Sequence, residues 1–414
     1  MKERIAILDG IRTPFIKADG VFKFLDADDL GAIVVKEILA RTGLPAKKID
    51  EVIFGNVAQP VHAANVSRVI ALKAGLPFSV IAHTVNRNCA SGMQSITAAA
   101  NQILSGESQI VIAGGTESMS NIPLVFGSEM KDFFFALFKA RSLKDRLGVL
   151  CSFRLRYLKP IIGVEKGLTD PICGMIMGLT AEVLSREFHI TRKEQDEFAL
   201  LSHQRAVAAI KEGRLAEEII PVPVPPDYKN VQAQDDGPRE NQSREALQKL
   251  KPYFDRKTGT VTVGNSCPLS DGAAAMILTS ESQAKALGLQ PLGYLKAYAY
   301  AGLEGARMGL GPYFAINLLL KKTGLTMKDF ELIEINEAFA AQIIANERAF
   351  NGQLDRRLFN VNGGAIALGH PVGTSGTRLV ITLLKEMARR KKQLGLATLC
   401  VGGGQGAALV LETK

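Results

Sequence analysis

An internal repeat constrains the fold of this chain more strongly than any other feature of its 414 residues. A short apolar run leads into Asn56 near the N-terminus, and a similar run leads into Asn336 in the last quarter of the chain. Cys89 follows Asn56 by 33 residues, and His370 follows Asn336 by 34. A repeat of this length indicates two related halves packed with pseudo-twofold symmetry. Equivalent loops then meet at one interface, and a site there takes residues from both halves.

The order of the repeated parts indicates an α/β fold. Val85-Asn86 in the first half has a counterpart in Val361-Asn362, and each pair precedes a helical segment, a buried strand and a run of glycines. The glycines are Gly114-Gly115 in the first half and 402–404 in the second. Strands that alternate with helices in this way imply a largely parallel sheet covered on both faces.

Residues 123 to about 255 interrupt this rhythm, and the chain is too long for one ordinary core. The interruption contains predicted helices at about 178–188 and 192–212, and a strand pattern returns at 260–279. We therefore predict three parts. They are an N-terminal half at 1–122 plus about 256–282, an inserted loop or cap domain at 123–255, and a C-terminal half at 283–414.

Cys89 lies between an extended lead-in and a long segment of small residues, Ala90 to Leu104, without charge or proline. This composition predicts a helix that is buried on most sides. A cysteine at the N-terminal end of such a helix lies in the positive end of the helix field, which favours the thiolate and makes the thiol a nucleophile at neutral pH. The alternative is a packed core cysteine, since free cysteines are among the most buried residues.

Three loops of the second half supply further reactive groups. Asn336 follows a strand, His370 is the only histidine of this half, and Cys400 precedes Gly402 and two more glycines. Taken alone, Cys400 is best interpreted as a core residue, and His370 is equally well a packed or a working histidine. Together with Cys89 they form a nucleophile, a base and a second acid or base on loops that follow strands, where ligands bind in α/β sheets.

These motifs resemble those of the thiolase family. The resemblance covers nearly the whole chain, from Arg12-Thr13-Pro14-Phe15 through the Cys89 loop, Asn-Glu-Ala-Phe, Gly-His-Pro and Cys-Val-Gly-Gly-Gly. The insertion at 129–166 is most similar to that of the thiolase subunit of fatty-acid β-oxidation multienzyme complexes. The resemblance implies an α/β thiolase fold, with two pseudo-symmetric mixed-sheet halves, helices in layers and an inserted loop domain.

The resemblance also implies a mechanism. Cys89 attacks the keto carbon of a 3-ketoacyl-CoA while His370 accepts its proton. Acetyl-CoA leaves as an enolate that Cys400 protonates, and Cys400 then activates the CoA thiol that removes the acyl group from Cys89. One oxyanion is assigned to His370 with a water held by Asn336, and the other to the backbone N–H groups of Cys89 and Gly402.

Contacts with substrate and CoA are implied in the same way. Phe339 packs against the pantetheine arm of CoA, Arg239 is the counterpart of a CoA-binding arginine, and Cys267 stands where short-chain thiolases have a serine. Ile176 replaces their histidine near the acyl end, and this apolar residue favours medium to long chains. The full set is Ile176, Met177, Arg239, Cys267, Ala338 and Phe339. CoA is expected as a co-substrate, with no permanently bound cofactor and, for want of metal-ligand spacing, no metal.

One segment, 131–159, contains eight Lys or Arg and two Asp, which is most of the net charge of +9. Phenylalanines alternate with the basic residues, and five residues are predicted to share one helical face: Leu147, Leu150, Cys151, Leu155 and Leu158. A basic amphipathic hairpin can lie in an anionic membrane surface, dock a partner subunit or simply cap the active site. The implied partner is a hydratase/dehydrogenase subunit. Nucleic acid is not expected, because the charge is local and mixed with phenylalanine.

Three candidate functions are compatible with these residues. The favoured one is degradative 3-ketoacyl-CoA thiolysis. An acetyl-CoA acetyltransferase running towards condensation is the first alternative, and a non-catalytic scaffold of a membrane-associated β-oxidation complex is the second. We expect a homodimer or homotetramer. No signal peptide or membrane span is visible, and unpaired cysteines favour a reducing compartment, either bacterial cytoplasm or an organelle matrix, with peripheral membrane contact left open.

Overall fold

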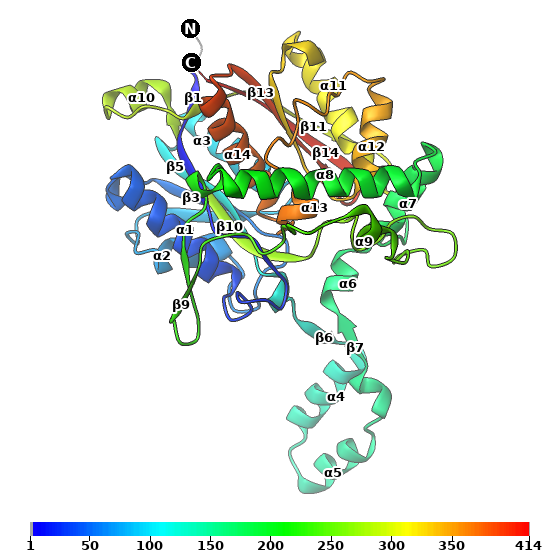
Figure 1. Ribbon diagram of the computed structural model, residues 1–414. Coiled ribbons are helices and arrows are strands. Elements are labelled where there is room, and N and C mark those ends of the chain that lie inside the picture. Colours follow the sequence, from blue (N-terminus) through cyan, green and yellow to red (C-terminus); the bar gives the residue numbers. More distant parts are fainter. Residues whose placement is uncertain (1–2, 414) are drawn as a thin grey trace.

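The computed structural model describes residues 3–413 and is built around one sheet, which has ten strands within that range (Figure 1). Nine strands follow the order β12-β13-β14-β11-β1-β10-β5-β3-β4, and β2 pairs with β10. Their bounds are β1 (Ile5–Arg12), β2 (Ile16–Lys17), β3 (Glu51–Gly55), β4 (Ile81–Val85), β5 (Ile110–Glu117), β10 (Ser270–Ser280), β11 (Gly293–Gly302), β12 (Leu332–Ile335), β13 (Leu394–Val401) and β14 (Gln405–Glu412).

The strand order has the same pattern on both sides of its middle. In the first half β3 pairs parallel with β5, and β5 pairs antiparallel with β10; β12, β13 and β14 repeat these pairings in the second half. Next to β12, a parallel bridge between Ile333 and Phe359 takes the place of the β3–β4 pairing. The predicted α/β fold with two pseudo-symmetric mixed halves is confirmed. The halves do not have separate sheets, because β1 pairs with β11 and joins them.

Helices form three layers around these strands. The central layer contains α3 (Ser91–Ser105) and α14 (Ser375–Arg390), which pack against each other and against strands of both halves. One outer layer contains α1 (Ala27–Thr42) and α2 (Val66–Lys73), and the other α11 (Gly311–Thr323) and α12 (Ala340–Ala349). The predicted burial of the helix after Cys89 is confirmed: Met93, Ile96 and Ala99 are fully buried.

Helices from the interruption complete the second half rather than a core of their own. They are α7 (Met177–Glu187) and α8 (Arg192–Lys211), close to the predicted ranges. Leu184 and Phe198 are buried in one cluster with Ile316 of α11 and Ile343 of α12. The strand pattern assigned to 260–279 is wrong in its first part, since β10 begins only at Ser270. The interruption also contains β8 (Val222–Val224), β9 (Asn230–Gln232) and α9 (Arg244–Gln248). Two short helices lie outside it, α10 (Glu281–Ala286) and α13 (Ala365–Leu368).

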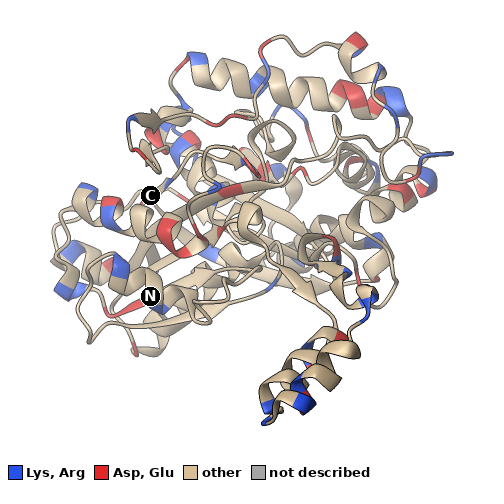
Figure 2. Cartoon of the chain, turned by 90° about the horizontal axis from the view of Figure 1, so that it is seen from below, with Lys and Arg blue, Asp and Glu red and all other residues tan. Residues whose placement is uncertain are grey.

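The basic segment forms an arm that projects from the body (Figures 1 and 2). A ribbon of β6 (Leu124–Phe126) and β7 (Pro160–Ile162) carries α4 (Ser128–Lys139) and α5 (Leu143–Cys151), and α6 (Gly163–Gly167) returns to the body. The predicted common helical face is wrong, because α5 ends at Cys151 and a separate 3-10 turn covers Leu155–Leu158. Within residues 3–413, no helix is both long and apolar enough to cross a bilayer.

Candidate active site

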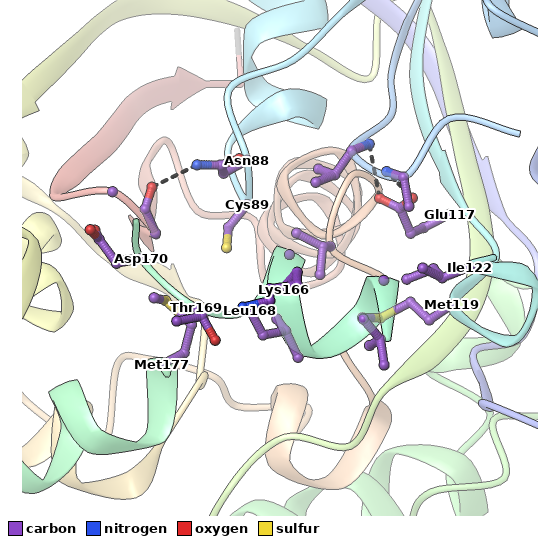
Figure 3. Close-up of a pocket in the computed structure, with 18 of the residues that line it drawn as sticks. Asn88, Cys89, Glu117, Met119, Ile122, Lys166, Leu168, Thr169, Asp170 and Met177 are labelled. Atoms are coloured by element: carbon purple, nitrogen blue, oxygen red, sulfur yellow. Dashed lines mark hydrogen bonds between the residues drawn. The ribbon is translucent and has the colours of Figure 1, made fainter. Parts of the chain in front are cut away.

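The loop that carries Cys89 is fixed to the second half of the molecule. Cys89 lies between β4 and α3, and the preceding Asn88 has a left-handed backbone with φ of 44°. The side-chain amide of Asn88 donates to the carbonyl oxygen of Gly402 at 2.8 Å (Figure 3). The Cys89 loop is therefore joined to the glycine loop that follows β13, as expected for a site built at the interface of the two halves.

One cavity of about 120 Å³ brings most of the predicted residues together. Cys89 comes from the first half, and His370 and Cys400 come from loops and strand ends of the second. The other predicted residues that line this cavity are Ile176, Met177, Cys267, Ala338 and Phe339. Phe339 is buried and packs edge-to-face against Phe254, with 6.1 Å between ring centroids. Arg239 is exposed and lines neither this cavity nor its larger neighbour.

A second cavity of about 540 Å³ begins at the same cysteine (Figure 3). Its walls are mainly apolar and come from segments on either side of the arm, with Met119, Ile122, Val125 and Leu168 among them. Cys89 thus lies where two cavities meet. The sequence interpretation missed these walls, because only the return of the chain through α6 places 163–171 opposite 119–125.

The prediction that the helix field makes Cys89 a thiolate is wrong. Burial raises the pKa of the Cys89 thiol above its ordinary value, and the charge of Glu117 adds to the increase. The backbone N–H groups of Gly402 and Cys89 act on the sulfur and lower its pKa, but burial is the larger effect. Cys89 therefore rests as a thiol and needs a base.

His370 has the properties of that base. Its Nδ1 lies 2.6 Å from Ser375 Oγ, and that hydroxyl donates to the carbonyl of Pro371 at 3.0 Å. Because the hydroxyl proton is used in this way, Nδ1–H is the donor to Ser375 and Nε2 carries the lone pair. Burial, with a smaller effect of the Arg378 charge, lowers the His370 pKa to about 4, so the imidazole is neutral at pH 7 and accepts a proton.

Asn336 lies beside the same imidazole. Its side-chain nitrogen is 3.4 Å from His370 Nε2, and its Oδ1 is buried without a hydrogen-bond partner among the described residues. Buried amide groups are usually satisfied by protein or by ordered water. The geometry suits the predicted water site at Asn336.

Three thiols lie close enough to influence one another. Burial raises the pKa of Cys400 well above its usual value, and Cys89 and Cys267 raise it further. Burial, with a smaller contribution from Cys89, raises the pKa of Cys267 to about 12. Cys400 therefore rests in the protonated form, which is the form that can donate a proton to a carbanion.

The other histidines and the acidic clusters lie outside these cavities. His83 pairs with Glu51 at 2.8 Å. Among the described residues, one grouping has ligand atoms close enough for a metal ion: Asp26, Asp28 and His62. The ammonium of Lys73 lies 2.5 Å from an Asp28 oxygen and supplies positive charge there.

Known proteins provide an independent comparison. A sequence profile described as thiolase, N-terminal domain, matches residues 5–282, and one described as thiolase, C-terminal domain, matches 289–413. A 3-ketoacyl-CoA thiolase of Escherichia coli O127:H6 is 42% identical over 428 aligned residues, which cover 100% of this chain and 97% of the relative. A 3-ketoacyl-CoA thiolase of Shewanella pealeana is 41% identical with the same coverage.

Solved structures give the same picture. An acetyl-CoA acetyltransferase of Bacillus anthracis superposes with a TM-score of 0.90 and 39% identity, covering 99% of each chain. The human mitochondrial 3-ketoacyl-CoA thiolase in complex with CoA superposes with a TM-score of 0.89 and 36% identity, covering 100% of this chain and 98% of the other.

Proposed function

The chain belongs to the thiolase family, and from that membership we propose that it is a 3-ketoacyl-CoA thiolase of fatty-acid β-oxidation. It is an acyltransferase that uses CoA to cleave a 3-ketoacyl-CoA into acetyl-CoA and an acyl-CoA shortened by two carbons. One observation carries the proposal: Cys89, His370 and Cys400 line a single cavity although they come from opposite halves of the chain.

The first half-reaction uses the resting protonation states. Neutral His370 accepts the thiol proton of Cys89 as its sulfur attacks the keto carbon. The bond between the α-carbon and the keto carbon breaks, which leaves an acyl group on Cys89 and the enolate of acetyl-CoA. Cys400, protonated at rest, donates its proton to the enolate carbon.

The second half-reaction restores these states. The Cys400 thiolate takes the proton of an incoming CoA thiol, whose sulfur attacks the acyl-Cys89 carbonyl. The Cys89 thiolate leaves and recovers its proton from His370. The N–H groups of Cys89 and Gly402, which already act on the resting sulfur, are the donors for the oxyanion on the acyl carbon, and His370 with an Asn336-bound water serves the enolate oxygen.

The two cavities suggest where the parts of the substrate bind. The pantetheine arm would lie along Phe339 and Ala338, in the cavity that contains Cys400. The acyl chain would then extend into the larger apolar cavity beyond Cys89. Its volume of about 540 Å³ supports the predicted preference for medium to long chains.

A thiolysis assay across acyl lengths tests the function. We expect the wild-type protein to cleave 3-ketohexadecanoyl-CoA faster than acetoacetyl-CoA, and Cys89→Ala to be inactive with both. Faster cleavage of acetoacetyl-CoA would refute the chain-length preference. Full activity of Cys89→Ala would refute the mechanism, whereas a wild-type protein without thiolysis of either substrate would leave the scaffold role as the better explanation.

Condensation of two acetyl-CoA molecules is the second candidate. The 39% identity with the Bacillus anthracis acetyl-CoA acetyltransferase favours it, and both directions would use the same three residues. The large, mainly apolar second cavity favours thiolysis of longer chains. Ile176 lines the smaller cavity instead, so it adds no support.

The arm at 131–159 is proposed to contact an anionic membrane surface or a hydratase/dehydrogenase subunit, in cytoplasm or an organelle matrix. The support is its projection from the body and its exposed apolar side chains beside basic ones; Phe138 is 88% exposed. Flotation with anionic vesicles tests the membrane contact. Equal flotation of the wild type and a deletion of 131–159 would exclude it.

A homodimer is proposed through the edge of the sheet. Within the described residues, β4 ends the strand order at this side, and Ile81 on it is 61% exposed. Antiparallel pairing of two β4 strands would cover this edge and continue the sheet across two copies. Analytical ultracentrifugation of Ile81→Asp against wild type tests the contact.

A further inference from the structure

Strand pairing gives an exact correspondence between the two halves. Gly55 pairs with Gly115 in the first half, and Ile335 pairs with Thr398 in the second. Because Gly55 and Ile335 immediately precede Asn56 and Asn336, Gly115 corresponds to Thr398. Two residues further along these strands, Glu117 therefore corresponds to Cys400. The glycine runs compared in the sequence do not occupy matching positions.

An independent strand pairing gives the same result. Glu117 pairs with Gly272 of β10, and Cys400 pairs with Gly406 of β14. Both glycines open the sequence Gly-Ala-Ala. The counterpart of Cys89 follows from the helices: Cys89 lies two residues before Ser91, where α3 starts, and Gly373 lies two residues before Ser375, where α14 starts.

The molecule thus contains a second copy of the catalytic arrangement, in which Asn56, Glu117 and Gly373 take the places of Asn336, Cys400 and Cys89. Asn56 and Glu117 come from the first half and Gly373 from the second. In this copy Glu117 is buried and its carboxylate accepts four hydrogen bonds. One oxygen accepts from the side chain of Asn56 at 3.0 Å and the N–H of Ala58 at 2.9 Å. The other accepts from the N–H groups of Val57 at 3.1 Å and Gly373 at 2.8 Å.

The contact with Gly373 crosses between the halves. Gly373 lies three residues after His370 in the same loop. The approach is tight: a Cβ at Gly373 would lie 2.8 Å from the Glu117 carboxylate, and a Cβ at Gly115 would lie 2.2 Å from the carbonyl oxygen of Gly373. Glu117 also lines the larger cavity together with Cys89 (Figure 3). The loop that carries His370 is therefore fixed to the half that carries the nucleophile.

We propose that Glu117 is a positioning residue, whose carboxylate holds the 369–374 loop so that His370 meets Cys89 at the distance needed for proton transfer. The inference rests on the proposed function and adds to it a residue outside the reacting groups. Thiolysis is sensitive to this contact because displacement of a catalytic group by about 1 Å costs about 10²-fold in rate.

The test is Glu117→Gln in the full-length protein. The amide keeps the shape of the side chain but turns one acceptor into a donor, so two of the four N–H groups lose their partner. We expect kcat for thiolysis to fall about 10²-fold with the KM for CoA within twofold of wild type. Hydrogen exchange of the 369–374 amides should become faster, while exchange in α3 stays unchanged.

Glu182→Gln is the matched control. Glu182 is also buried, and its carboxylate accepts backbone N–H groups at 2.8 Å, but from Thr260 and Val261. The same loss of kcat in this control, or a folded Glu117→Gln protein with kcat within twofold of wild type, would overturn the proposal.

A second variant, Asn56→Ala, tests the proposal if the Glu117→Gln protein does not fold. Asn56→Ala removes one of the four donors and leaves the Gly373 contact in place, so a fall in kcat of about threefold to tenfold is expected. A wild-type kcat would overturn the proposal. A different outcome, no thiolysis by the wild-type protein, would refute the proposed function. In that case, hydrogen exchange at 369–374 in a folded Glu117→Gln protein would still decide whether Glu117 fixes the loop.

Discussion

Corresponding residues in the two halves of this molecule have different hydrogen-bond partners. Asn56 and Asn336 both have a buried Oδ1 without a hydrogen-bond partner among the described residues, so the oxygen does not distinguish them. The two residues differ in the contacts of their side-chain nitrogens. The side-chain nitrogen of Asn56 donates to Glu117 and to the Thr116 carbonyl at 3.0 and 2.9 Å. Within residues 3–413, the side-chain nitrogen of Asn336 has one contact, with His370 Nε2 at 3.4 Å. In the first half, therefore, the Asn56 nitrogen is held by Glu117, whereas the Asn336 nitrogen is left with a long contact and can turn towards a substrate or water.

A change in the histidine loop accompanies this difference. Five positions separate Asn86 from Ser91 in the first half, whereas thirteen separate their counterparts Asn362 and Ser375. The additional residues in the second half include α13 and His370. One fold unit used twice therefore provides the loop of the proposed nucleophile in one copy and the loop of the proposed base in the other, and the two loops meet at the interface between the halves.

Removing Cys400 should give the largest effect. In the proposed mechanism Cys400 protonates the enolate and activates CoA, so thiolysis by Cys400→Ala should fall about 10³-fold, within the range for loss of general acid–base catalysis. Alkylation of Cys89 by iodoacetamide should stay within twofold of wild type, because Cys89 and His370 remain. Cys151→Ser, which changes an exposed cysteine of the arm, should leave both rates unchanged. Equal loss of alkylation and thiolysis in Cys400→Ala would contradict the separate roles.

The pH dependence of the Cys89 reaction should come next in size. The pKa of the thiol is raised by burial, and His370, with a pKa of about 4, stays neutral across pH 6–9. The thiolate fraction then grows about tenfold for each pH unit below the thiol pKa. Iodoacetamide alkylation should therefore rise continuously from pH 7 to 9, by about 10²-fold. A plateau between pH 6 and 8 would instead indicate a thiolate–imidazolium pair.

Ser375→Ala should have a smaller effect. The matched serines accept an N–H in both halves: Ser91 Oγ from the backbone of Arg87 at 2.9 Å, and Ser375 Oγ from His370 at 2.6 Å. Without the Ser375 hydroxyl, no acceptor holds the His370 proton on Nδ1, and the tautomer with a free Nε2 lone pair is less populated. We therefore expect kcat to fall about tenfold, while the KM for CoA stays within twofold of wild type. Ser375→Thr should restore part of the rate. If alanine and threonine variants have equal rates, the hydroxyl does not set the tautomer.

The motifs around Cys89, His370 and Cys400 made it possible to predict that these residues share one site, because each lies in a short, unusual sequence, and they line one cavity. The repeat made the pseudo-symmetric fold predictable. The role proposed for Glu117 was not predictable, since the register of β5 against its neighbouring strands decides which residue matches Cys400. The wall at Met119 and Leu168 depends on the return of the arm to the body. The thiol pKa was mispredicted because a sequence shows a helix terminus but not the burial that outweighs it.

The smallest expected effect concerns a contact between the halves that lies outside the chemistry. Thr97 of α3 and Tyr300 of β11 share a hydrogen bond of 2.7 Å, and the guanidinium of Arg87 lies 4.3 Å from the centre of the tyrosine ring. Tyr300→Phe keeps the ring and its packing and removes only the hydroxyl. Thr97 keeps a second partner, the carbonyl of Gln94 at 3.1 Å, so no buried group is left without a hydrogen bond.

The free energy of unfolding should therefore fall by about 0.5–1.5 kcal/mol, measured by urea denaturation, with kcat within twofold of wild type. A double-mutant cycle of Tyr300→Phe and Thr97→Ala isolates the interaction energy of the Thr97–Tyr300 pair. A large loss of kcat in Tyr300→Phe would show that this contact shapes the nucleophile loop through Arg87. The functional difference between the halves would then extend beyond the loops at the strand ends into the helix layer that both halves share.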